Sequence, residues 1–144
     1  MEEFFRLLLE EEHYQPGKAL YQSKVNYGER IKDPHDPDAV KHAARLGAEL
    51  GADIIKTNYT GSIDTFREVT ETCPAPVVIA GGPRMDTDRD VLQMIKDSID
   101  AGGSGVSIGR NIFQHNDLAG MVKAVRAVLI DDRDVDEALK EVQG

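Results

Sequence analysis

The sequence lacks the features of several common protein classes. It has 144 residues, no tryptophan and a single cysteine, Cys73, so an internal disulfide is excluded. No apolar run approaches the roughly 20 residues that span a membrane, and the amino terminus lacks the basic-then-apolar order of a secretory signal peptide. We therefore expect a cytoplasmic protein with no membrane partner. Its hydrophobic and charged fractions, 40% and 30%, are ordinary for one soluble domain with a buried core.

Basic stripes are also missing, which argues against nucleic acid as a partner. The net charge is −9, but residues 1–12 and 131–144 each carry −4 of it. The middle of the chain is therefore close to neutral, and a small phosphorylated molecule is compatible with it.

A metal site is not expected from the histidines. His13, His35, His42 and His115 have no metal-ligand spacing, and no carboxylate cluster accompanies them. His42 falls in a predicted helix and His115 in a polar loop, so we expect both on the surface.

Helical and strand patterns alternate regularly from residue 36 onward. Asp36 is a typical N-cap followed by proline at the first helical position, and Gly51 is a typical stop. The patterns predict helices at 37–50, at 63–72, from about 87 up to Gly102, at 117–129 and at 135–142, and strands around Lys56, at 76–80 and at 105–108. In the helix at 117–129 the residues expected to face inward are Leu118, Met121, Val122, Val125, Val128 and Leu129. Before residue 36 the signal is weaker, with a helix at 2–12 and a poor strand at 20–25.

The predicted strands recur at a spacing close to the length of one βα unit. This spacing indicates an α/β fold with a parallel sheet and right-handed crossovers. A doubly wound open sheet and a piece of a (β/α)8 barrel both fit this order. A complete barrel needs about 250 residues, so a barrel would be incomplete here. In both folds the carboxyl ends of the strands form one rim that carries the functional site.

Lys56 is the first candidate at that rim. Side chains alternate along a strand, so Ile54 and Lys56 share a face and Ile55 takes the other. A lysine among apolar neighbours can act as a nucleophile, whereas the alternative is a strand-end lysine whose ammonium reaches water. Cys73 precedes Pro74 at the amino end of a strand, on the opposite rim, so we expect no nucleophilic role for it.

Two glycine turns follow the next two strands. Gly81 and Gly82 can present backbone N–H groups to an anion, although a simple tight turn explains them equally well. Gly109 and Arg110 add one fixed positive charge at the neighbouring strand end, unless Arg110 only pairs with a surface acid. Together they favour a phosphate site, because barrel enzymes commonly hold phosphate in the loops after their last two strands.

Three segments match a known family in order and at its spacing: KTNYTG at 56–61, PVVIAGGP at 76–83 and GRNIFQH at 109–115. On these segments the chain resembles the archaeal-type class I aldolases over about residues 28–142. Within that family it is most similar to the 2-amino-3,7-dideoxy-D-threo-hept-6-ulosonate synthases, which serve aromatic amino-acid biosynthesis, with the class I fructose-bisphosphate aldolases next.

The resemblance implies a partial (β/α)8 TIM barrel, the carboxyl-terminal half with strands six to eight and a poorer strand five. Residues 28–144 would form this half-barrel domain, and residues 1–27 an unassigned N-terminal helix and loop. Lys56 on strand six would form a Schiff base with a phosphorylated ketose, with no cofactor. The residues implied to bind the substrate phosphate are Gly81, Gly82, Gly109 and Arg110.

The sequence also departs from the family. Strands one to four, including an acid on strand one, have no counterpart. Strand five of the family ends in Tyr-Pro-Arg-Gly, where the tyrosine is the acid/base; aligned on Gly28, this chain has Val25 there, followed by Asn26 and Tyr27.

Three interpretations remain open: an aldolase half that is truncated or inactive, a non-catalytic phosphate-binding half-barrel that self-associates, and part of a longer polypeptide. A half-barrel leaves both sheet edges unpaired. It also leaves uncovered an inner face with Ile54, Lys56 and Ile79 or its neighbours, so we expect a homo-oligomer.

Overall fold

The computed structural model describes the backbone of Tyr21–Gln22 and all of residues 33–142. The helix predicted at 2–12, and the positions of Val25, Asn26 and Tyr27, lie outside the described residues.

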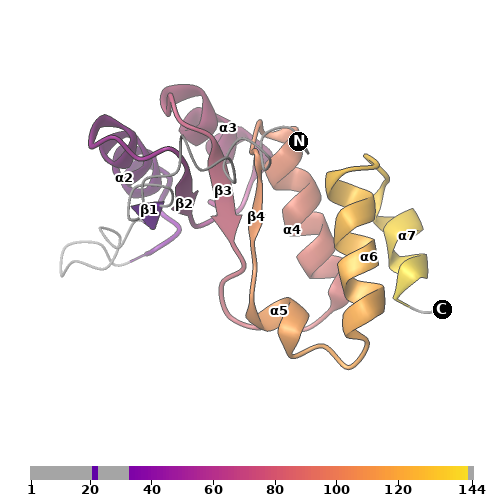
Figure 1. Ribbon diagram of the computed structural model, residues 1–144. Coiled ribbons are helices and arrows are strands. Elements are labelled where there is room, and N and C mark those ends of the chain that lie inside the picture. Colours follow the sequence, from indigo (N-terminus) through magenta and orange to yellow (C-terminus); the bar gives the residue numbers. More distant parts are fainter. Residues whose placement is uncertain (1–20, 23–32, 143–144) are drawn as a thin grey trace, which may run out of the picture.

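The described chain is built on one parallel sheet (Figure 1). Its strands are β1 (Tyr21–Gln22), β2 (Ile55–Thr57), β3 (Val77–Ala80) and β4 (Gly105–Ser107), and they lie side by side in sequence order. Every neighbouring pair is parallel, which confirms the predicted α/β class and parallel sheet. The poor strand predicted at 20–25 is present as β1.

The helices are α2 (Pro37–Glu49), α3 (Ile63–Thr72), α4 (Asp88–Asp100), α5 (Arg110–Phe113), α6 (Leu118–Leu129) and α7 (Val135–Ala138). Four of them begin and end within two residues of the predicted bounds. The last predicted helix is shorter, because after α7 the chain tightens into a 3₁₀ turn at Leu139–Glu141. The short α5 was not predicted, since four residues carry no helical period.

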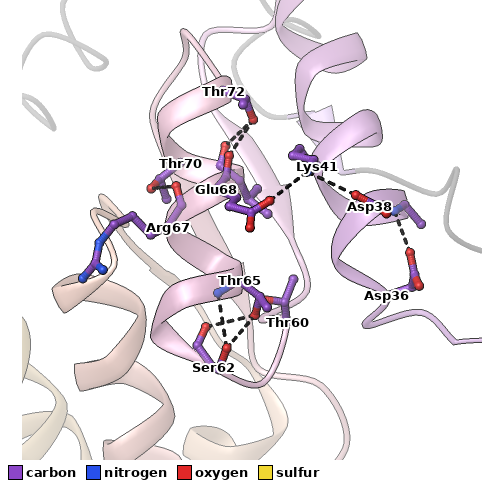
Figure 2. A network of polar contacts seen from close by, with 12 residues as sticks. Asp36, Asp38, Lys41, Thr60, Ser62, Thr65, Arg67, Glu68, Thr70 and Thr72 are labelled. Carbon is purple, nitrogen blue, oxygen red and sulfur yellow. Dashed lines mark hydrogen bonds and ion pairs between the residues drawn. The ribbon is translucent and has the colours of Figure 1, made fainter.

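Side-chain caps explain where the long helices start. The oxygens of Asp36, Ser62, Thr87 and Asp117 each accept a hydrogen bond from a backbone N–H in the first turn of the next helix. Figure 2 shows two of these caps, and the pair between Lys41 Nζ and Glu68 Oε2, 2.8 Å apart, that links α2 to α3.

The two faces of the sheet differ in burial. Ile55, Val77 and Ile79 are at most 2% exposed and pack under the helices. Lys56 is in register with Val78 of β3, and both are only half-buried, so they lie on the opposite, inner face. Of the alternatives expected beside Lys56, Ile79 or its neighbours, Ile79 lies on the packed face and its neighbour Val78 lies on the inner face.

The apolar side chains of α6 also differ from the prediction. Met121, Val125 and Val128 are buried as expected, but Leu118 and Val122 are 45% and 50% exposed. The helix is apolar around more of its circumference than the single covered face can bury.

No helix among the described residues is long and apolar enough to cross a membrane.

Candidate functional site

Lys56 lies in the middle of β2, flanked in register by Gln22 of β1 and Val78 of β3. Within the described chain its ammonium makes no ion pair and no hydrogen bond. Val78 is three residues before Gly81, so the inner face that carries Lys56 leads directly to the rim with the glycine turn.

The turn after β3 requires its two glycines for different reasons. A Cβ at Gly81 would come within 2.6 Å of Ile108 Cγ2, so the close packing of this turn on the chain after β4 excludes any side chain. Gly82 has φ +60°, a left-handed conformation that glycine adopts without strain. The backbone of Gly81 can pack directly against Ile108 because glycine has no side chain.

Asn111 fixes this turn, and sequence reasoning missed it. Its side chain is 6% exposed, and Nδ2 donates to the carbonyls of Gly81 and Pro83 over 2.8 and 3.1 Å. Its Oδ1 accepts from the N–H of Met85 at 2.8 Å. One buried amide on α5 therefore holds the whole loop after β3, and only its place within the GRN triplet could have drawn attention to it.

Arg110 joins the same two loops from the solvent side. Its Nη2 donates to the carbonyl of Gly82 at 2.8 Å, and it has no carboxylate partner among the described residues. The alternative considered for Arg110, a pairing with a surface acid, is therefore absent in that part of the chain. A guanidinium has five N–H donors, so most of them stay available to a ligand.

Backbone donors gather at these two loops. In the described part of the chain, the N–H groups of Gly82, Gly109 and Arg110 have no protein acceptor. Unpaired N–H groups beside a guanidinium form the kind of concavity that binds anions. The structure thus brings together Gly81, Gly82, Gly109 and Arg110, while Lys56 lies one strand away on the inner face.

His115 is not the surface residue that was predicted. Its side chain is 16% exposed, and its Nε2 lies 3.0 Å from Asp88 Oδ1 at the start of α4. Its Nδ1 is 2.8 Å from the carbonyl and 3.0 Å from the N–H of Asp117. The loop after β4 is thereby tied to α4, the helix that follows the glycine turn of β3. His42 is exposed, as predicted.

Cys73 is structural. It is 7% exposed, its Sγ donates to the carbonyl of Ala44 at 3.6 Å, and burial raises the pKa of its thiol. A thiol that stays protonated and enclosed is a poor nucleophile.

A pocket of about 480 Å³ opens beside the glycine turn, away from Lys56. Its walls are the loops after β2 and β3 together with one stripe of α4. Its members include Tyr59, Gly82, Asp90, Met94 and Asp97, and Lys56, Gly109 and Arg110 are not among them.

The region that carries these features matches a known protein family. The profile of the DeoC/LacD family aldolases covers residues 22–115, from β1 through α5. The chain belongs to the DeoC/LacD aldolase family. The match includes Lys56 and both glycine turns, and it confirms the resemblance inferred from the three segments.

Two of the curated relatives differ in their activities. The chain is 48% identical over 107 residues to the 2-amino-3,7-dideoxy-D-threo-hept-6-ulosonate synthase of Halobacterium salinarum, an overlap that covers 74% of this chain and 40% of that protein. It is 40% identical over 116 residues to a class 1 fructose-bisphosphate aldolase of the same species, covering 80% of this chain and 44% of the relative.

A solved Schiff-base-forming fructose-1,6-bisphosphate aldolase shares the fold. It superposes with a TM-score of 0.74 at 32% identity, covering 76% of this chain and 44% of that structure. The chain of this DeoC/LacD aldolase family member therefore spans less than half the length of the relatives it matches.

Proposed function

We propose that this chain carries the Schiff-base and phosphate-binding half of a metal-independent class I aldolase or transferase acting on a phosphorylated ketose. The observation that supports it is the position of Lys56, unpaired on the inner face of β2, one strand from a turn with free backbone donors. The activities of the relatives agree with this chemistry.

In the proposed reaction the neutral amine of Lys56 attacks the ketone carbon of the substrate. Loss of water from the resulting carbinolamine gives an iminium. The hydroxyl on the departing carbon then loses its proton to a base, and the neighbouring carbon–carbon bond breaks. The departing fragment leaves as an aldehyde, the first product, and the electron pair of the broken bond passes into the iminium, which becomes an enamine. Protonation of the enamine carbon and hydrolysis then return Lys56 and release the second product. Each proton transfer needs an acid or base near Lys56.

The phosphate of the ketose would lie on the backbone N–H groups of Gly81, Gly82 and Gly109, with Arg110 supplying charge. Unlike a lysine, a guanidinium presents a rigid fork of donors to a phosphate. We propose the 2-amino-3,7-dideoxy-D-threo-hept-6-ulosonate synthase reaction first, and fructose 1,6-bisphosphate cleavage as the alternative substrate.

Borohydride trapping tests the Schiff base. The chain is incubated with fructose 1-phosphate or fructose 1,6-bisphosphate, reduced, and analysed by peptide mass spectrometry. We expect an adduct on Lys56, none in Lys56→Met, and an unchanged adduct in the control Lys123→Met, which alters an exposed lysine on α6. Adducts spread over several lysines, with none favoured at Lys56, would contradict the proposal.

A second function has its own supporting observation. No carboxylate or phenol in the described chain makes a hydrogen bond or an ion pair with Lys56, so no acid/base residue is engaged with the lysine there. We therefore also propose a phosphate-binding half-barrel without turnover. Phosphate affinity that survives in Lys56→Met, together with no trapped adduct in the unmodified chain, would favour this function.

We propose that residues 28–144, together with β1 ahead of them in the same sheet, form half of a (β/α)8 barrel, and that a second copy covers its open side. The support is an edge strand, β4, with one neighbour in the described sheet, and the exposed side chains of Phe113, Leu118 and Val122. Sedimentation velocity should give a dimer that Val122→Glu converts to monomer. A monomer at all concentrations would overturn self-association while leaving the Schiff-base proposal intact.

A further inference from the structure

The pocket beside Tyr59 has a chemistry opposite to that of the phosphate loops. Its lining includes two carboxylates, Asp90 and Asp97, and none of its lining residues is a lysine or arginine. The remaining wall is largely apolar, with Pro83 and the thioethers of Met85 and Met94. A phosphate would be repelled here, although Gly82 belongs to both places.

Hydrogen-bond acceptors dominate the polar part of the wall. His35 Nδ1 lies 2.7 Å from the carbonyl of Tyr59, and because a carbonyl only accepts, Nδ1 carries the proton. In the neutral ring Nε2 is then an acceptor. Asp97 Oδ1 accepts from Gln93 Nε2 at 2.7 Å, and Asp90 Oδ2 accepts from Thr87 Oγ1 at 2.6 Å, so each carboxylate retains further acceptor capacity.

Tyr59 supplies an independent sign that the pocket takes a ligand. The residue is 8% exposed, its ring packs edge-on against Phe66 with centroids 5.3 Å apart, and its buried hydroxyl has no hydrogen-bond partner. Tyr59 and Asp97 line the same pocket, and after burial the nearby Asp97 carboxylate is the second cause that raises the pKa of this phenol. A buried hydroxyl without a partner costs free energy that a ligand could recover.

Two hydrogen bonds join α3 and α4 near the carboxyl end of α4. There Thr70 Oγ1 donates to the carbonyl of Ala101 at 2.6 Å, and Arg67 Nη2 to that of Asp100 at 3.2 Å. A volume of 480 Å³ falls within the ~300–1,000 Å³ range of small-molecule sites.

We propose that this pocket binds a small primary ammonium ion joined to a short apolar body, with Asp97 and the Tyr59 hydroxyl holding the ammonium and Met85 and Met94 the apolar part. A metal ion fits less well, because no group of three His, Cys, Asp or Glu in the described residues could hold one. The site is separate from Lys56 and does not depend on the Schiff-base reaction.

Methyl-labelled methionine provides a direct test by NMR. Benzylammonium, benzyl alcohol and benzoate are titrated into the full chain while the methyl signals of Met85 and Met94 are followed. We expect benzylammonium to shift both signals and to bind at least tenfold more tightly than benzyl alcohol, with no shift from benzoate. Equal binding of the alcohol, or no shift of either methionine, would overturn the site.

Two variants on α4 make the test specific. Asp97→Asn should weaken benzylammonium at least tenfold, whereas the matched control Asp100→Asn, on the same helix but outside the pocket, should change affinity less than twofold. Tyr59→Phe, which keeps the ring, should weaken binding several-fold. Unchanged affinity for benzylammonium in both Asp97→Asn and Tyr59→Phe would refute the proposal. Lys56→Met should bind benzylammonium as tightly as the unmodified chain, whether or not the chain has aldolase activity.

Discussion

The two faces of the sheet differ in how completely their side chains are buried. On the helix-packed face, Ile55 and Ile79 are completely buried, and each position is fixed by packing. On the inner face, Lys56 and Val78 are half-buried and lack a covering layer in the described chain. Stability therefore depends mainly on one face and the proposed chemistry on the other, because only a face that is not filled can admit a substrate.

Two adjacent residues of β3, one on each face, give the strongest test of the difference in stability between the faces. Ile79→Ala on the packed face should cost about 2–5 kcal/mol of unfolding free energy, whereas Val78→Ala on the inner face should cost less than about 1 kcal/mol. Urea denaturation followed by circular dichroism measures both. Equal losses would mean that the inner face is also filled.

Asn111, which holds the glycine loop at the rim of the sheet, provides the next test. Asn111→Ala leaves two carbonyls and one N–H of the glycine loop without partners, so we expect a loss of about 2–3 kcal/mol. Phosphate affinity, measured by calorimetry, should fall as well because Gly81 and Gly82 lose their support. The control Asn116→Ala, at an exposed loop position, should change neither quantity.

The pH dependence of the unfolding free energy tests the packed side of the sheet, because Tyr59, just after β2, is buried there. Burial, with a contribution from Asp97, raises the pKa of its phenol from 10.0 to about 12. The folded chain thus holds this proton more tightly than the unfolded chain. Its contribution is complete below pH 10 and is lost as pH rises toward 12, an effect of order 1–2 kcal/mol.

Thermal unfolding at several alkaline pH values measures this loss. Tyr59→Phe should decline less steeply between pH 10 and 12 than the unmodified chain. Parallel declines would show that Tyr59 does not titrate with unfolding.

The smallest expected effect on stability is at Lys56. Lys56→Met should change the unfolding free energy by no more than about 0.5 kcal/mol, because the lysine is half-buried and unpaired. Borohydride trapping should nevertheless be lost completely. A large destabilisation would indicate a structural role for the ammonium and would weaken the contrast between the faces.

The sequence predicted most of the frame because the relevant signals are local. The side chains of Asp36, Ser62 and Asp117 cap helices through hydrogen bonds that span three residues, and the apolar runs at β2 and β3 have strand length. Local pattern failed at α5, which is too short for a period. It also failed at Leu118 and Val122, which have helical spacing but no covering partner among the described residues.

The candidate site divides in the same way. Lys56, the paired glycines and Arg110 were identified from strand ends and from three short segments, and the family match covers them. The roles of Asn111, His115 and Asp97 could not be predicted, because each acts on residues about 27 to 38 positions away. No local pattern encodes such a distance.

The sequence alone therefore determined the order of strands and helices, the aldolase family, and Lys56 as the residue to test. Only the tertiary structure decided that Lys56 lies on the same face of the sheet as Val78. It also decided that the side chain of Asn111 holds the glycine loop, and that a pocket with two carboxylates lies beside that loop. The reason is physical: capping and periodicity act within a few residues, whereas burial, register and electrostatic pairing depend on which distant segments the fold brings together.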